Sequence, residues 1–78
     1  MSTVLATRDV EIKGKTYQVI LVDLTDTPFG IYEVYMKEYL QNGQLSGVLA
    51  VPYQGPYKKE AKEVYESVSE ERNYNVWK

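Results

Sequence analysis

Apolar and polar side chains alternate along residues 3–53, which is the pattern of half-buried β-strands. Gly, Pro, Asn and Asp interrupt this alternation where the chain has to turn. One run, Val19 to Val22, is apolar on both faces and therefore predicts a central strand that is covered on both sides. The pattern predicts four strands, at residues 3–12, 16–24, 30–40 and 45–53.

The strongest turn signal is Asn42-Gly43, between the third and fourth predicted strands. A type I′ turn needs φ > 0 at both central residues, and Asn-Gly is the favoured pair for it. A two-residue turn at this point predicts a register in which mostly apolar residues face each other. The predicted pairs are Leu40 with Leu45, Glu38 with Gly47, Met36 with Leu49, Val34 with Val51, and Tyr32 with Tyr53.

Lys13-Gly14 turns the chain between the first two strands, and two registers are open there. The turn is either a two-residue loop or a three-residue loop in which Gly14 forms a bulge. We favour the bulge, because it places Glu11 opposite Lys15 as a cross-strand ion pair. The two-residue loop would pair Val10 with Tyr17 and Ala6 with Leu21, whereas the bulge would pair Leu5 with Leu21 and Glu11 with Lys15.

After the fourth strand the apolar period changes, which predicts a helix over residues 56–72. Gly55 is an acceptable N-cap, and Pro56 suits the first helical position because its missing N–H is not needed there. The helix is amphipathic, with Lys and Glu on its polar face. Its apolar stripe consists of Tyr57, Ala61, Val64, Tyr65 and Val68.

These elements predict a single α+β domain: a four-stranded, mainly antiparallel sheet of two hairpins with one C-terminal helix. One helix covers one face of the sheet. The other face either curls towards a small barrel or leaves apolar side chains for another chain. The tail at 73–78 is aromatic, and we expect Tyr74 or Trp77 to dock on the sheet or Val76 to join its edge.

Composition argues against several classes of function. The 78 residues include no Cys and no His, so disulfides, thiolate or imidazole metal sites and the usual catalytic base are unavailable. Asp23 and Asp26 alone are a thin basis for a metal site. The net charge of −2 disfavours phosphate-driven binding of nucleic acid. We expect a cytoplasmic protein without catalysis, cofactor, metal or membrane association.

Tyrosine is the residue type on which the functional hypothesis depends. The chain has eight, and tyrosine offers a large contact area with a polar tip at low entropic cost. Alternation places Tyr35, Lys37 and Tyr39 on one strand face, although such tyrosines can also simply half-cover a small sheet. Lys58 and Lys59 lie beside free N–H groups of the predicted first helical turn. The candidate binding residues are Ile31, Tyr35, Lys37, Tyr39, Lys58 and Lys59.

The resulting hypothesis is a small protein–protein interaction module that binds through its tyrosine-rich sheet face. It would be an inhibitor or adaptor of the kind that phages and other mobile elements encode, or one subunit of a homodimer. The alternative is a small β-barrel that binds single-stranded nucleic acid by stacking bases on Tyr35 and Tyr39. Nucleic acid is the less favoured partner, because Glu33 is nearby and Lys37 is the one basic residue on that strand face.

Overall fold

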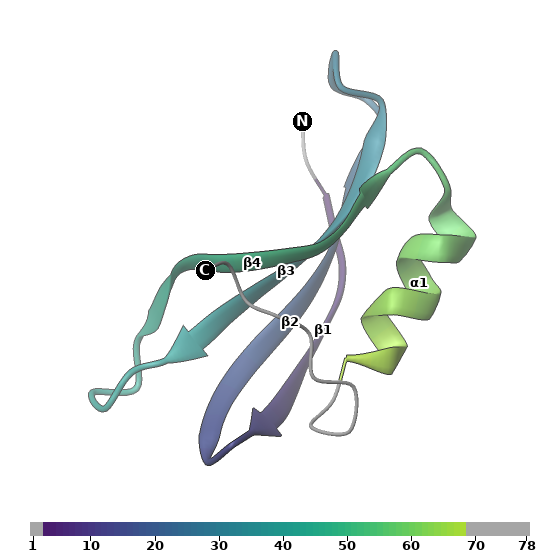
Figure 1. Ribbon diagram of the computed structural model, residues 1–78. Coiled ribbons are helices and arrows are strands. Elements are labelled where there is room, and N and C mark those ends of the chain that lie inside the picture. Colours follow the sequence, from purple (N-terminus) through teal and green to yellow (C-terminus); the bar gives the residue numbers. More distant parts are fainter. Residues whose placement is uncertain (1–2, 69–78) are drawn as a thin grey trace.

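The computed structural model describes residues 3–68, and there the chain forms four strands followed by one helix (Figure 1). Neighbouring strands are antiparallel, and the sheet order follows the sequence, so β1 and β4 are its edges. The sheet is not closed into a barrel. The predicted α+β class is confirmed. The elements are β1 (Thr3–Ile12), β2 (Lys15–Leu24), β3 (Ile31–Tyr39), β4 (Leu45–Gly55) and α1 (Lys58–Ser67).

The middle of β2 is buried on both faces of the sheet, as its apolar run predicts. Val19 and Leu21, with exposed fractions of 0% and 3%, belong to the core cluster that also contains helix residues. Ile20 and Val22 point to the opposite face and are 7% and 4% exposed. β2 lies between β1 and β3, so it is one of the two inner strands of the sheet.

The first hairpin has a two-residue turn, so the favoured three-residue loop is wrong. Lys13 and Gly14 both have positive φ, 53° and 79°, as a type I′ turn requires. The bulge register would have turned Asp9 towards the helix, because a slip of one residue exchanges the faces of a strand. The observed register packs Val10 and Ala6 against the core instead. The expected pairs Leu5–Leu21 and Glu11–Lys15 are replaced by Ala6–Leu21 and Ile12–Lys15.

The second hairpin has the longer loop, so the predicted type I′ turn at Asn42-Gly43 is also wrong. Gly43 has a φ of 84°, but Asn42 is not among the residues with positive φ. The Gly43 N–H donates to the Leu40 carbonyl at 2.9 Å, and the Leu40 N–H donates to the Gln44 carbonyl at 2.8 Å. This is the pattern of a type I turn followed by a glycine bulge. Such a loop needs φ > 0 at the glycine alone.

The pairing of β3 with β4 shifts three times, so β4 has extra residues opposite β3. Gly47 and Pro52 favour such irregularities, since glycine fits bulges and proline lacks the ladder N–H. Near the hairpin the Ser46 hydroxyl accepts the Glu38 backbone N–H at 2.9 Å and satisfies this donor. The predicted pairs Leu40–Leu45, Glu38–Gly47, Met36–Leu49, Val34–Val51 and Tyr32–Tyr53 are replaced by Tyr39–Leu45, Lys37–Val48, Met36–Ala50, Val34–Tyr53 and Tyr32–Gly55.

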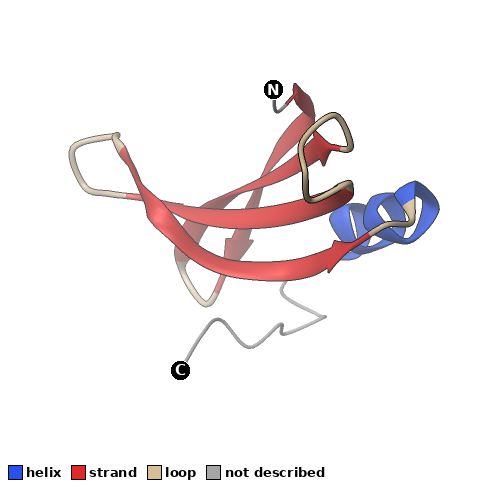
Figure 2. Ribbon diagram, turned by 90° about the horizontal axis from the view of Figure 1, so that it is seen from above, coloured by secondary structure: helices blue, strands red, loops and turns tan. Residues whose placement is uncertain are grey.

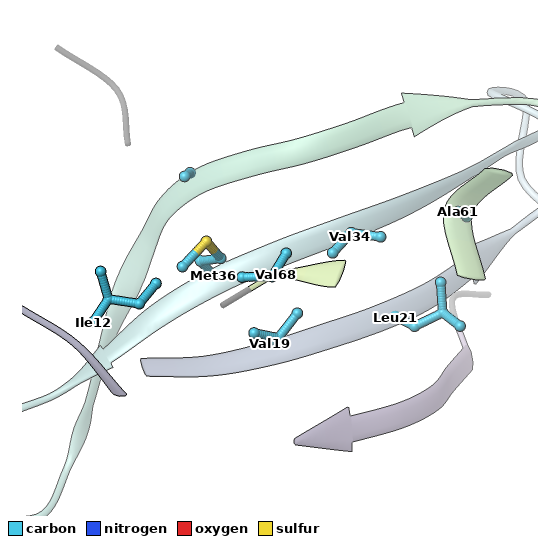
Figure 3. Packing of buried hydrophobic residues seen from close by; sticks show 8 residues of the cluster. Ile12, Val19, Leu21, Val34, Met36, Ala61 and Val68 are labelled. Atoms are coloured by element: carbon cyan, nitrogen blue, oxygen red, sulfur yellow. The ribbon is translucent and has the colours of Figure 1, made fainter. Parts of the chain in front are cut away.

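Helix α1 packs against β2, β3 and β4 on one side of the bent sheet (Figure 2). Ala61 and Val68, both 0% exposed, are the residues of the predicted apolar stripe that enter the core. Figure 3 shows them among the strand side chains that they contact. The buried cluster consists of Ile12, Val19, Leu21, Val34, Met36, Ala50, Ala61 and Val68.

The ends of α1 differ from the predicted ones. Tyr57 rather than Gly55 is the N-cap, and no side chain caps the helix there. At the other end Val68 is extended, with φ −65° and ψ 119°, so the helix stops at Ser67. The predicted helical residues 69–72 and the predicted docking of Tyr74, Val76 or Trp77 lie outside the described residues.

Arg8 on β1 caps the C-terminal end of α1 with its side chain. Its Nη1 donates to the backbone carbonyl oxygens of Tyr65 at 2.7 Å and of Val68 at 2.9 Å. The last turn of α1 contains no basic residue of its own, although cations are favoured there by the helix dipole. The sheet therefore supplies the positive charge and the hydrogen-bond donors that the end of the helix needs.

Candidate functional site

We call the sheet face that points away from α1 the open face. Val34 and Met36 of β3 belong to the core beneath α1, so the residues that alternate with them point to the open face. The first turn of α1 carries Lys58 and Lys59, and the helix packs on the opposite face, so these two lysines are not part of this surface. The candidate residues that the structure brings together are Ile31, Tyr35, Lys37 and Tyr39.

The end of the open face next to the two hairpin turns carries polar side chains on β1, β2 and β3, and we call it the polar end. Val48 and Leu45 of β4, which are 41% and 39% exposed, lie opposite Lys37 and Tyr39 there. Asp9, Gln18 and Lys37 form one cross-strand row there. The Tyr39 hydroxyl donates to Asp9 Oδ1 at 2.9 Å and accepts from Gln18 Nε2 at 3.5 Å. The hydrogen bond to Asp9 raises the pKa of Tyr39. Tyr39 is therefore held against β1 and β2 with a carboxylate beside its hydroxyl.

The other end of the open face, next to the β2–β3 connection, is apolar and exposed. Val4 pairs with Val22, which pairs in turn with Glu33 of β3. Val4 is 59% exposed, and Phe29 in the β2–β3 connection (the loop at the top of Figure 1) is 74% exposed. Exposed apolar side chains at one end of a sheet face make that end a candidate binding surface.

A pocket of about 310 Å³ lies at this apolar end. Its walls come from β2, β3, β4 and the β2–β3 connection. Glu33, in the wall, is 8% exposed and is the one charged side chain among residues 3–68 that is buried. The pocket is lined by Leu24, Phe29, Ile31, Glu33, Tyr35 and Gln54.

Two uncharged side chains hold the Glu33 carboxylate in one orientation. The Tyr35 hydroxyl donates to Glu33 Oε1 at 2.5 Å, and Nε2 of Gln54 donates to Oε2 at 2.5 Å. Burial, followed by the hydrogen bond and the charge of Glu33, raises the pKa of Tyr35 to about 12. The pocket thus combines apolar walls with one fixed carboxylate, an arrangement suited to a ligand that is apolar along its length and positively charged at its tip.

Glu33, Phe29 and Gln54 are not among the site residues predicted from the sequence. Glu33 gives a usable signal, because it lies between Ile31 and Tyr35 on one strand face, where an acid interrupts apolar and aromatic neighbours. Gln54 gives no such signal. It faces Glu33 because of the extra residues in β4, which move the register away from the simple pairing.

Asp23, considered above as a metal ligand, has its carboxylate engaged within its own loop. Its Oδ1 accepts from the Thr25 hydroxyl at 2.6 Å and the Thr25 N–H at 2.8 Å, and these bonds lower its pKa. Within residues 3–68, no three acidic side chains are grouped so that they could hold a metal ion. In the same part of the chain, no helix has the length and apolar character needed to cross a membrane.

The fold alone does not assign a function, because small antiparallel sheets with one helix serve many unrelated roles. A function is therefore inferred from the open face and its pocket. Comparison of the chain with protein-family models, with curated proteins and with solved structures found no match.

Proposed function

We propose that the chain is a protein-interaction module without catalysis of its own, and that it binds a protein partner through the open face. The observation that carries this proposal is the exposure of apolar side chains at one end of that face. Phe29 is 74% exposed and Val4 is 59% exposed, and Phe29 borders the pocket. An exposed apolar side chain that borders a concave site is typical of surfaces that another molecule covers.

The arrangement of the open face matches the anatomy of a protein interface. Interfaces combine an apolar and aromatic centre with a polar rim, and tyrosine is enriched among the residues that carry their affinity. Ile31 and Tyr35 lie beside the exposed apolar residues, whereas Lys37 and Tyr39 lie towards the polar end. The face therefore offers both an apolar region from which a partner can exclude water and a polar rim that can fix the orientation of the partner.

The open face favours a protein over single-stranded nucleic acid. A nucleic-acid interface would use Tyr35 and Tyr39 as stacking platforms and basic side chains as phosphate contacts. Each of these tyrosines instead donates its hydroxyl to a carboxylate, Glu33 or Asp9. Carboxylates at both stacking positions would repel the phosphate backbone that supplies most of the affinity for nucleic acid.

Site-specific photo-crosslinking in the cells that make the protein tests this proposal. A benzophenone amino acid replaces Lys37 on the open face, and the matched control replaces Glu63, which is exposed on α1. We expect a protein adduct from position 37 and none from position 63. Equal adducts at both positions, the absence of any adduct, or an adduct with nucleic acid alone would overturn the proposal.

A second measurement decides whether the partner is another copy of the chain. Size-exclusion chromatography with light scattering, over a concentration series, gives the mass in solution. If the open face is the interface of a homodimer, Phe29→Glu converts the dimer to a monomer, because it adds a charge to the region that the partner would dehydrate. If the chain is a monomer at every concentration, the adduct at position 37 contains a different protein, which mass spectrometry identifies.

A further inference from the structure

We infer that the pocket at the apolar end receives an arginine side chain of the partner protein, with its guanidinium against the Glu33 carboxylate. This inference rests on the proposed function, because it names what the partner presents to the open face. Three properties of the pocket lead to it: its buried charge, its walls and its size.

The buried charge points to a cationic ligand. Glu33 is 8% exposed, and its hydrogen-bond partners within residues 3–68 are Tyr35 and Gln54, both uncharged. A carboxylate removed from water is best compensated by a cation. Its two oxygens offer about four acceptor positions, so two bonds leave room for a further donor on each oxygen. A guanidinium can fill both positions at once.

The walls favour arginine over lysine. A guanidinium is planar and weakly hydrated, and it stacks on aromatic rings, whereas an ammonium holds its water shell tightly. Leu24 and Ile31 provide apolar surface for the methylene groups, and Phe29 provides an exposed ring. A lysine would lose more hydration in this pocket and would gain no stacking.

The size of the pocket fits one long side chain. Its volume of about 310 Å³ is at the lower end of the roughly 300–1,000 Å³ of ligand sites. The pocket also opens onto the face that carries Lys37 and Tyr39, so a chain lying along that face could insert one residue while its backbone stays outside.

The pocket can be tested without knowledge of the partner. N-acetyl-arginine methylamide is titrated into the ¹⁵N-labelled protein, with the citrulline analogue, which has the same shape and no charge, as the matched probe. We expect saturable NMR shifts at Glu33, Tyr35 and the Gln54 side-chain amide. Affinity should be on the order of tenfold weaker for citrulline, because hydrogen bonds to charged groups are the stronger ones.

Variants assign this binding to Glu33. Glu33→Gln should weaken arginine binding on the order of tenfold, whereas the control Glu63→Gln should leave it unchanged. Equal binding of arginine and citrulline, or unchanged binding by Glu33→Gln, would overturn the inference. A lysine analogue that binds as tightly as arginine would also overturn it. The comparison of probes uses the unmodified protein and does not depend on whether the variant folds.

Competition then shows whether the arginine belongs to the partner. Saturating N-acetyl-arginine methylamide should lower the yield of the adduct at position 37, because the probe occupies the place of the partner's side chain. An unchanged yield would overturn the assignment to the partner. The two proposals fail separately: the titration reports on the pocket with no partner present, and the crosslinking pattern reports on the open face with no probe present.

Discussion

The guanidinium of Arg8 lies 5.9 Å from the centre of the Tyr65 ring and donates a hydrogen bond of 2.7 Å to the Tyr65 carbonyl oxygen. These residues are 57 positions apart, so the contact joins the first strand to the end of the helix. Arg8 also donates to the Val68 carbonyl, and it brings positive charge to the negative end of the helix dipole. An arginine that interrupts the apolar alternation of β1 is therefore a structural residue.

We predict that Arg8→Met lowers the free energy of unfolding by about 1–3 kcal/mol, because two carbonyl groups lose a charged donor. Arg8→Lys should have an intermediate effect, since lysine keeps the charge but not the planar fork. Urea unfolding followed by circular dichroism measures the change. Lys62→Met, at an exposed position of α1, is the control and should stay within about 0.5 kcal/mol. An Arg8→Met protein as stable as the wild type would contradict the role of Arg8.

A substitution at Lys13, in the turn between β1 and β2, should stabilise the protein. Lys13 has a φ of 53°, a conformation that costs an ordinary L-residue about 1–2 kcal/mol and that asparagine tolerates better. Lys13→Asn should therefore raise the free energy of unfolding by about 0.5–1 kcal/mol, measured by thermal unfolding. Asn42→Gly is the matched change in the other turn. It should give no gain, because Asn42 has no positive φ and its Oδ1 accepts the Gln44 N–H at 3.0 Å. If Asn42→Gly stabilised the protein and Lys13→Asn did not, the two turn types would be the reverse of those described.

The Tyr35 hydroxyl should ionise only at unusually high pH, and its ionisation should make the free energy of unfolding depend on pH. Its pKa in the fold is about 12, above the ordinary 10.0. A raised pKa favours the protonated form in the folded state, so this contribution to stability is complete below pH 10 and is lost as pH rises from 10 to 12. The difference in tyrosinate absorbance between wild type and Tyr35→Phe isolates this one titration. In Glu33→Gln the pKa should fall but stay above 10.0, because burial remains; an unchanged pKa would remove Glu33 as a cause.

The core beneath α1 should dominate stability. Met36 is 2% exposed, and Met36→Ala should cost about 2–5 kcal/mol through lost burial and the cavity left behind. A chain of 78 residues has about 4–12 kcal/mol in total, so this variant should be largely unfolded at moderate urea. Leu45→Ala, at a side chain that is 39% exposed, should cost clearly less. Equal losses in urea unfolding would show that the core is not where the structure places it.

The strands and the helix were predictable because their signals are local. Val19 to Val22 are apolar at every position, and such a run is stable in water only when both faces are covered. Ala61 and Val68 lie on one stripe of a period-3.6 pattern, and both are buried. Burial imposes these patterns whatever the neighbouring elements are.

The turn types and registers were not predictable from the turn residues alone. Lys13-Gly14 and Asn42-Gly43 both supply a glycine for a positive φ, and the shorter loop formed at the pair without asparagine. In the first hairpin the register is set by which side chains of β1 face the core, because the other register would have turned Asp9 towards the core. The alternation of β1 therefore already distinguishes the two registers. In the second hairpin the register depends on the extra residues of β4, which Gly47 and Pro52 favour and which bend the strand.

The candidate surface was predictable in part. Alternation alone indicates that Tyr35, Lys37 and Tyr39 share a face, and the structure places them so. The pocket requires more, since Phe29 reaches it from the β2–β3 connection and Gln54 reaches it from a shifted register. Contacts between segments far apart in the chain leave no periodic signal.

Because of the three register shifts along β4, another strand can add to the β1 edge of the sheet more readily than to the β4 edge. Another strand adds to an edge whose N–H and C=O groups repeat regularly over several residues. β1 keeps that repeat from Ala6 to Ile12, whereas β4 loses it and includes Pro52, which has no N–H to offer. A second copy could therefore join through β1, and both outer edges of the pair would then be β4. If a second copy joined there, growth of the sheet would end at two chains and would not proceed to a fibre.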